Sequence, residues 1–243
     1  MCARFTLRVS AEAMKELFDL DELPELLVRY NIAPTQDVSA VTQSREGERM
    51  LRPLRWGLVP SWAKSLAVGS TMINARSESL HERGAFRTAF EKRRCLIPSD
   101  GFFEWKEVTP EEEQGSLFGE PTKVKAGKPK KQPYHFTLRD GKPFAFAGLW
   151  ERWSDPEGHV VDTCTIVTTA ANELVAKLHD RMPVILAPED YALWLDRHEC
   201  DTAKLMPLMS PYPSERMKAT AVNPVVGNSR IDTPECVQPF NAA

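Results

Sequence analysis

The sequence has no apolar run that approaches the ~20 residues of a membrane-spanning helix. It also lacks an apolar signal segment, because residues 1–7 read MCARFTL, so secretion is not expected. The five cysteines are odd in number, widely spaced and without a C-x-x-C pair, which argues against a zinc site or a disulfide framework. We therefore expect a cytoplasmic protein with reduced thiols, no metal and no other cofactor.

The sequence also has no excess of positive charge. The 31 Lys and Arg against 34 Asp and Glu give a net charge of −3. Proteins that coat nucleic acid without sequence preference are usually basic overall, so this balance argues mildly against DNA or RNA as a partner. A restricted basic cleft remains compatible with it, because the distribution of charge matters more than the sum.

The hydrophobic pattern predicts many short strands and a few short helices. We expect an α+β fold around a curved, mostly antiparallel sheet. Between the strands, a stretch rich in Glu, Lys, Pro and Gly at 109–133 predicts a solvated loop insertion. Strands are expected at 4–9, 38–43, 50–59, 95–97, 102–108, 134–138, 143–150, 160–168 and 217–222, and helices at 10–20, 80–94 in two pieces, 172–178, 188–195 and 201–208.

Cys2 is the first residue that could carry chemistry. Its position alone favours an incidental cysteine in an edge strand. Alternatively, Met1 is removed because the second residue is small, and the chain then begins with an amine beside a thiol. Their reference pKa values of ~7.7–8.0 and ~8.5 leave both partly nucleophilic near neutral pH. Such a terminus attacks an acyl centre through sulfur, or condenses with an aldehyde to an imine and then a thiazolidine ring.

Two further segments place polar groups in patterns of interest. Asn74 and Arg76 share one face of an extended chain, and a guanidinium prefers planar oxyanions such as phosphate. The alternative is a turn-forming Asn beside a surface salt bridge. Glu104 stands between Phe103 and Trp105, on the opposite face of a strand. A strand carboxylate is usually solvated, but in a cleft desolvation would raise its pKa towards values useful for acid–base work.

A histidine and a tryptophan complete the candidates. His179 precedes Asp180 and Arg181 just before an apolar run. A lone histidine is more often structural, but the flanking Arg181 and Pro183 favour a shaped loop that binds an anion. Trp62 follows a proline turn and either packs in the core or stacks on a base.

Taken in order, these segments resemble one family, the SOS-response-associated peptidase (SRAP) family, also described as abasic-site processing proteins. The similarity runs from Cys2 to at least Pro224. It implies a single SRAP domain over residues 1–243, a β-barrel-like core flanked by short helices and a variable loop at about 109–133. The segments that carry it are 1–5 (MCARF), 30–35 (YNIAPT), 56–62 (WGLVPSW), 74–78 (NARSE), 94–98 (RCLIP), 101–105 (GFFEW) and 179–183 (HDRMP).

The resemblance implies an abasic-site sensor on single-stranded DNA in the DNA damage or SOS response. Cys2, exposed after Met1 removal, would form a reversible thiazolidine crosslink with the ring-opened deoxyribose. Asn74 would position the terminus and the sugar, Glu104 would act as general acid/base, and His179 would assist ring opening. The peptidase label would fit self-removal of Met1 or a protease activity. The implied DNA contacts are Arg4, Pro34, Trp62, Arg76, Ser77, Thr168 and Arg181.

The expected protein is a monomer that joins the nucleoid when bound to DNA and meets replication-fork proteins. Two other functions stay open. An N-terminal-cysteine amidohydrolase, such as a glutamine amidotransferase, shares Cys2 but usually needs a synthase domain, for which the chain has no room. A non-covalent single-strand binding module would leave Cys2 incidental, and its DNA complex would fall apart in hot detergent.

Overall fold

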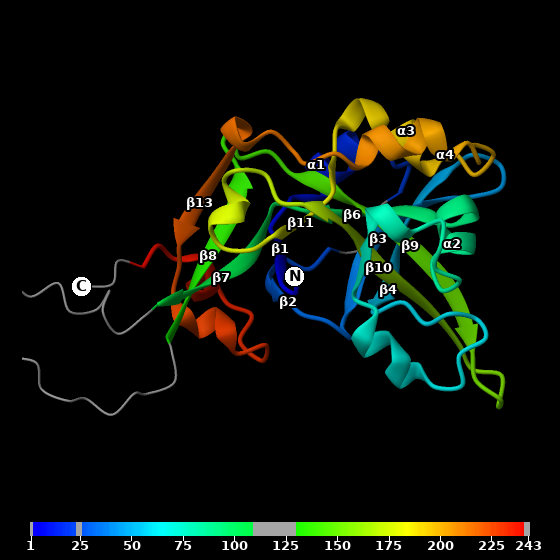
Figure 1. Ribbon diagram of the computed structural model, residues 1–243, viewed down its shortest axis with the longest axis horizontal. Coiled ribbons are helices and arrows are strands. Elements are labelled where there is room, and N and C mark those ends of the chain that lie inside the picture. Colours follow the sequence, from blue (N-terminus) through cyan, green and yellow to red (C-terminus); the bar gives the residue numbers. More distant parts are fainter. Residues whose placement is uncertain (1, 23–25, 109–129, 241–243) are drawn as a thin grey trace, which may run out of the picture.

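The computed structural model describes residues 2–22, 26–108 and 130–240. These residues fold into two β-sheets with short helices around them (Figure 1). The architecture is α+β, as the many short strands and few helices predicted.

The larger sheet closes on itself into a barrel. Its ring runs β10–β4–β3–β6–β9 and returns from β9 to β10, with antiparallel pairing throughout except between β10 and β4. The expected curved, mostly antiparallel and barrel-like core is therefore confirmed. The ring strands are β3 (Asp37–Gln43), β4 (Arg49–Trp56), β6 (Arg94–Ser99), β9 (Phe144–Ser154) and β10 (Val160–Ala170), and the additions are β5 (Asn74–Arg76), β11 (Arg181–Pro183) and β12 (Ile185–Leu186).

The smaller sheet is antiparallel and has the order β13-β8-β7-β1-β2. The first strand of the chain lies inside this sheet, because Phe5 pairs with Ile32 on one side and Phe102 on the other. Phe5 also joins the sheet to the barrel, with its ring centroid 5.2 Å from Trp56 and 5.6 Å from Phe146. The strands are β1 (Phe5–Leu7), β2 (Arg29–Ile32), β7 (Gly101–Val108), β8 (Lys130–Leu138) and β13 (Met217–Ala221).

The helices are short and lie outside the sheets (Figure 1). Helix α1 begins at a side-chain cap, because the Ser10 hydroxyl accepts a hydrogen bond from the backbone N–H of Ala13. No helix in the described ranges is long and apolar enough to cross a membrane. The α-helices are α1 (Ala11–Phe18), α2 (Arg87–Lys92), α3 (Tyr191–Leu195) and α4 (Thr202–Leu205), and the 3-10 turns are η1 (Leu66–Thr71), η2 (Ser77–Ser79), η3 (Val175–Lys177), η4 (Pro188–Asp190), η5 (Met206–Met209), η6 (Ser214–Arg216), η7 (Pro224–Gly227) and η8 (Pro234–Val237).

Some expected boundaries are wrong. The helix expected over 80–94 is reduced to α2, because residues around Gly84 form turns. Strand β2 was not expected, since its four residues are too few for a pattern. The expected insertion at 109–133 ends earlier, because residues 130–133 already pair with β7 as part of β8. Residues 109–129 lie outside the described ranges.

Candidate functional site

The amino-terminal segment lies in the interior of the fold. Strand β1 has a neighbour on each side, so Cys2 does not belong to an edge strand. The backbone N–H of Phe103 donates to the Arg4 carbonyl at 3.0 Å. The hydrogen bonding between β7 and the amino-terminal segment therefore extends from β1 back to Arg4. Cys2 has 0% of its surface exposed. Burial raises the pKa of the Cys2 thiol, and the Glu104 carboxylate raises it further.

Asn74 reaches Cys2 from the barrel. Strand β5 runs parallel to β10 with Asn74 opposite Ile166, and the Trp56 indole donates to the Ile73 carbonyl at 2.8 Å, which fixes the start of β5. The Asn74 side-chain N–H donates to the Cys2 carbonyl at 2.8 Å. Its oxygen is buried and accepts no hydrogen bond from the described part of the chain. A buried acceptor left unpaired costs ~1–3 kcal/mol, so a donor that arrives at this oxygen would be favoured.

Glu104 is a buried carboxyl on β7, with 4% of its surface exposed. Phe102 packs in the main core, whereas Phe103 and Trp105 pack in a second cluster, as the alternation along the strand predicted. Burial raises the pKa of Glu104 to about 7; the positive chain terminus lowers it and the Asp180 carboxylate raises it. At neutral pH both protonation states are populated, so Glu104 can accept and donate a proton.

His179 lies in the loop between η3 and β11. The backbone N–H of Arg181 donates to its Nδ1 at 2.9 Å. The Asp180 carboxylate also lies 3.0 Å from Nδ1, so this nitrogen faces both a donor and an acceptor. In the tautomer that accepts from Arg181, the proton of the neutral ring is on Nε2. Burial, and then the positive chain terminus, lowers the pKa of His179; the Asp180 carboxylate raises it. The neutral ring therefore dominates at pH 7 and offers an N–H donor.

The structure brings together the four residues that the resemblance marks as catalytic. Asn74 donates a hydrogen bond to the Cys2 carbonyl, and the charge of the Glu104 carboxylate raises the pKa of the Cys2 thiol. The charges of Asp180 and of the chain terminus shift the pKa values of both Glu104 and His179. A thiol, an orienting amide, a carboxyl that titrates near neutral pH and an imidazole N–H suit proton-transfer steps at a carbonyl carbon.

Two of the expected phosphate contacts already have partners within the chain. Arg4 donates to the Asn31 side chain at 2.8 Å and to the Val226 carbonyl at 2.7 Å. Arg181 makes a bidentate pair with Glu78, with N–O distances of 2.6 and 2.9 Å. A DNA phosphate would have to share or replace these partners.

The remaining expected DNA contacts differ in exposure. Arg76 is exposed and makes no hydrogen bond or ion pair with the described residues, and Trp62 is 68% exposed. Pro34 is half-buried in a turn. Ser77 is buried, and so is Thr168, whose hydroxyl donates to a backbone carbonyl of β5 at 3.4 Å. Arg76 and Trp62 are thus the two with side chains open to a ligand.

Sequence reasoning missed two residues that shape the site. Asn31 is fully buried and connects the first residues of the chain to residues 226–231. Its side-chain oxygen accepts a hydrogen bond from Arg4, and its side-chain N–H donates to the carbonyls of residues 226, 228 and 231. Glu78 holds Arg181. Each lies inside a segment that carries the resemblance, 30–35 and 74–78, but no spacing rule connects either to its distant partner.

One group of metal-ligand side chains lies away from this site. Asp155, Glu157 and His159 occupy the turn between β9 and β10, with their ligand atoms within 4.8 Å of one another. Acidic groups on exposed turns are common without a metal. Within the described residues the candidate site itself contains no such group.

The fold agrees with the family comparison. The family model for SOS response associated peptidase (SRAP) matches residues 1–229, and the chain belongs to this family. Among its relatives, the abasic site processing protein YoqW of Bacillus subtilis is 39% identical over 98% of this chain and 99% of its own length. The abasic site processing protein HMCES of Pongo abelii is 31% identical over 90% of this chain, which spans 62% of that protein.

Solved structures share the fold. A crystal structure of a protein from Bacteroides thetaiotaomicron has a TM-score of 0.78 at 24% identity and covers 99% of this chain and 100% of its own. Another, of a protein from Bordetella bronchiseptica, has a TM-score of 0.72 at 29% identity and covers 91% of this chain and 100% of its own.

Proposed function

We propose that this protein processes abasic sites in single-stranded DNA, and that Cys2, freed by removal of Met1, captures the lesion as a reversible thiazolidine crosslink. The relatives' names supply the substrate. The observation that carries the chemistry is the hydrogen bond of 2.8 Å between Asn74 and the Cys2 carbonyl, beside a buried carboxyl whose pKa is about 7.

The proposed reaction needs no oxidant or reductant. Water first hydrolyses the Met1–Cys2 peptide bond and releases methionine. The Cys2 amine then adds to the aldehyde carbon of the opened deoxyribose, and loss of one water gives an imine. The thiol sulfur adds to the imine carbon while its proton passes to the nitrogen, which closes the five-membered ring. Aldehyde and aminothiol thus become thiazolidine and water, and the same steps in reverse release the DNA.

The side chains divide the proton transfers among them. Glu104 is suited to take the proton of the amine and return it to the departing hydroxyl, because its pKa of about 7 leaves both forms available. The neutral His179 ring offers its Nε2 proton to the sugar oxygen during ring opening. Asn74 orients the terminus through its N–H and has an oxygen left to accept from the sugar or from the amine.

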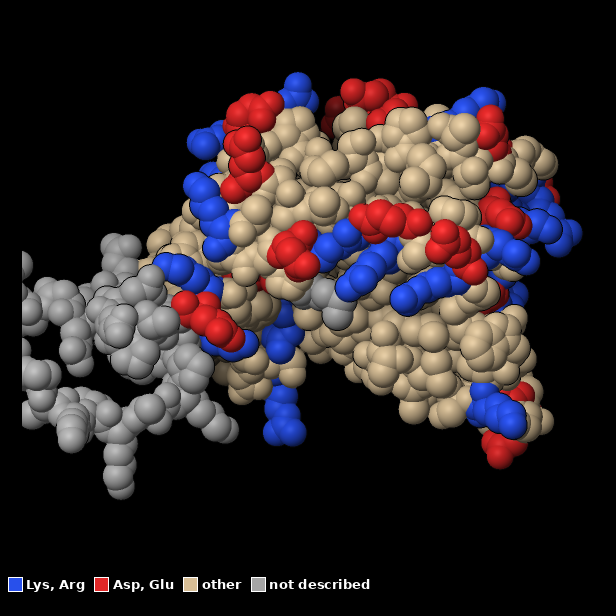
Figure 2. All heavy atoms as spheres, viewed as in Figure 1, with Lys and Arg blue, Asp and Glu red and all other residues tan. Residues whose placement is uncertain are grey.

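Recognition of DNA is assigned to a few contacts rather than a basic surface. Figure 2 shows Lys and Arg interspersed with Asp and Glu on the viewed face, which fits the net charge of −3. Arg76 would bind a phosphate and Trp62 would stack on a base. Arg4 and Arg181 would contact DNA only if they share or give up the hydrogen bonds to their partners within the chain. We take the chain to be a single SRAP domain that acts as a monomer, with lyase-like crosslinking and removal of its own Met1.

Denaturing electrophoresis after mixing the protein with single-stranded abasic DNA tests the proposal. We expect a detergent-resistant adduct that Cys2→Ala abolishes. An added N-terminal tag should abolish it too, because the amine then becomes an amide. Cys95→Ala provides the control, since Cys95 is as buried as Cys2 but lies in β6 of the barrel. A normal adduct from a protein with a blocked terminus would refute the thiazolidine chemistry, and a complex that dissolves in hot detergent would favour non-covalent binding.

A further inference from the structure

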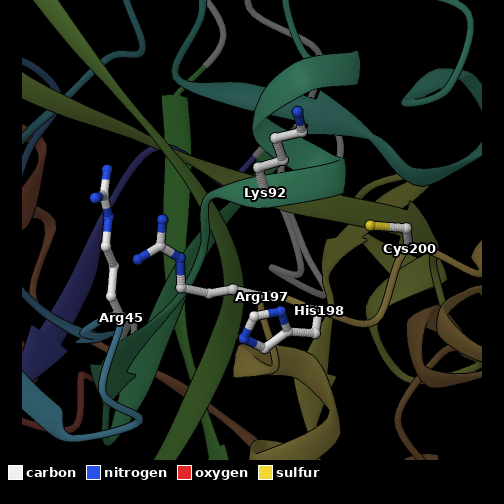
Figure 3. Close-up of a pocket in the computed structure, with 5 residues that line it drawn as sticks. All are labelled: Arg45, Lys92, Arg197, His198 and Cys200. Carbon is white, nitrogen blue, oxygen red and sulfur yellow. The ribbon is translucent and has the colours of Figure 1, made fainter.

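A cavity lies outside the candidate site. It has a volume of about 310 Å³ and is lined by Arg45, Lys92, Arg197, His198 and Cys200 (Figure 3). We call it the Arg45–Arg197 pocket. Three separate segments form it: the turn between β3 and β4, the last residue of α2 and the segment that follows α3. The volume falls at the lower end of the ~300–1,000 Å³ of small-molecule sites.

The charges of this lining are of one sign. Arg45, Lys92 and Arg197 form no hydrogen bond or ion pair through their side chains with any described residue. Figure 3 shows Arg45 and Arg197 entering the pocket from different segments of the chain. Like charges held around one cavity repel each other, and this repulsion disappears when an anion enters.

The acidic side chains nearby are engaged elsewhere or turned to solvent. Glu199 pairs with Lys204 at 2.7 Å. The Asp196 carboxylate accepts the backbone N–H of His198 at 2.9 Å. Glu46, the neighbour of Arg45, is exposed; its pKa is lowered mainly by hydrogen bonds in its own turn and to a smaller extent by the charge of Arg45. The lining therefore has no carboxylate of its own to neutralise its cations.

A buried arginine fixes two of the three segments. Arg94 is 4% exposed and donates only to backbone carbonyls among its recorded hydrogen bonds. These carbonyls include Glu91 at 3.0 Å, next to Lys92, and Glu199 at 2.9 Å, next to Cys200. Arg94 thereby binds the end of α2 to the segment after α3 and adds a further positive charge behind the pocket. Arg94 thus fixes the backbone that carries Lys92 and Cys200.

The pocket is remote from Cys2 along the barrel strands. Arg45 follows the end of β3. The turn before β3 is hydrogen-bonded to Trp56, whose indole donates to the Ile73 carbonyl next to Asn74 of the candidate site. The seven residues of β3, at about 3.3 Å each, separate the two ends by roughly 23 Å. Figure 1 shows α2 on the side of the barrel away from the amino terminus and α3 above the barrel.

We propose that the Arg45–Arg197 pocket binds a phosphoryl group, supplied by the DNA backbone or by a small phosphate ester. Guanidinium groups bind phosphate oxygens in bidentate fashion, and the ammonium group of Lys92 adds a further favourable charge for an anion. This site is independent of the Cys2 chemistry. Bound to a backbone phosphate, it would hold a strand well beyond the lesion; bound to a phosphate ester, it would place a small ligand on the far end of the barrel.

The test uses the full chain carrying Cys2→Ala, so that crosslinking does not affect the measurement. Arg45→Ala and Arg197→Ala are compared with Arg139→Ala, an exposed arginine in the turn after β8. One arm measures inorganic phosphate by calorimetry at low salt. The other measures a fluorescent oligothymidine by anisotropy over a range of salt concentrations. Because the two replaced side chains make no hydrogen bond with the described residues, the variants should keep the melting temperature of the parent.

We expect each pocket variant to weaken binding by roughly tenfold relative to Arg139→Ala in at least one arm. If only the binding of inorganic phosphate is weakened, the bound phosphoryl group comes from a small phosphate ester. Loss in the oligothymidine arm, with a salt slope lower by ~0.7 for each contact, identifies the DNA backbone. Pocket variants that match Arg139→Ala in both arms would overturn the proposal, whatever the outcome of the crosslinking assay.

Discussion

Replacing Glu104 with Gln is expected to stabilise the fold above neutral pH while it slows the chemistry. The carboxyl is 4% exposed and its pKa is raised by burial from 4.5 to about 7. The folded protein therefore holds this proton more tightly than the unfolded chain does. Below pH 4.5 Glu104 is protonated in both the folded and the unfolded state, so it does not lower the free energy of unfolding. Stability is lost as the pH rises from 4.5 to 7, and the full cost remains at higher pH.

The magnitude follows from the two pKa values. At about 1.4 kcal/mol for each pKa unit, the gap between 4.5 and about 7 corresponds to about 3 kcal/mol. Glutamine has the same shape but never ionises. The free energy of unfolding of Glu104→Gln, minus that of the parent, should therefore grow by about 3 kcal/mol between pH 4.5 and 7.5 and then stay constant.

Urea denaturation of both proteins at a series of pH values measures this difference and cancels the other titrating groups. A pH-independent offset from the amide leaves the shape of the curve unchanged. In the crosslinking assay the same variant should form and release the adduct more slowly by comparable factors, because a catalyst acts on both directions equally. The limb near pH 7 in the parent's rate profile should vanish. A flat stability difference, or unchanged rates in both directions, would refute the reasoning.

Three further outcomes are expected. His179→Ala should slow crosslinking by ~10²–10⁴-fold, and a substrate locked as the open aldehyde should partly rescue it; without rescue, His179 has a positioning role. Arg76→Ala should lower the slope of log affinity against log salt by ~0.7 for every DNA sequence, and a loss limited to one sequence would exclude a phosphate contact. Gly101→Ala should destabilise the fold, because its Cβ would lie 2.2 Å from the ring nitrogen of His135, and a melting temperature equal to that of the parent would contradict this contact.

Periodicity and turn residues were enough to predict the class of fold and the orientation of Glu104. Alternation along β7 separates Phe102 from Phe103, and this separation survives in the structure because each face of the strand packs against a different cluster. The same rule placed Asn74 and Arg76 on an extended segment, now β5. Local patterns succeed here because the side-chain period is a property of the strand itself.

The partners of the arginines could not be predicted. Arg4 is held by Val226 and Arg181 by Glu78, residues far away in sequence that meet only when the sheets assemble. No local pattern distinguishes a guanidinium that will be held in this way from one that stays open, such as Arg76. For the same reason the Arg45–Arg197 pocket has no signature in the sequence.

The position of β1 inside its sheet has a consequence for the timing of the proposed removal of Met1. Its partner β7 begins at Gly101, so about a hundred residues must leave the ribosome before Phe5 can pair on that side. At ~5–20 residues per second this takes roughly 5–20 s. An external aminopeptidase needs the first residues extended in its own cleft, and Cys2 in the folded protein has no exposed surface. Such an enzyme would therefore have to remove Met1 during synthesis, and a chain that folds with Met1 in place would depend on its own side chains to remove it.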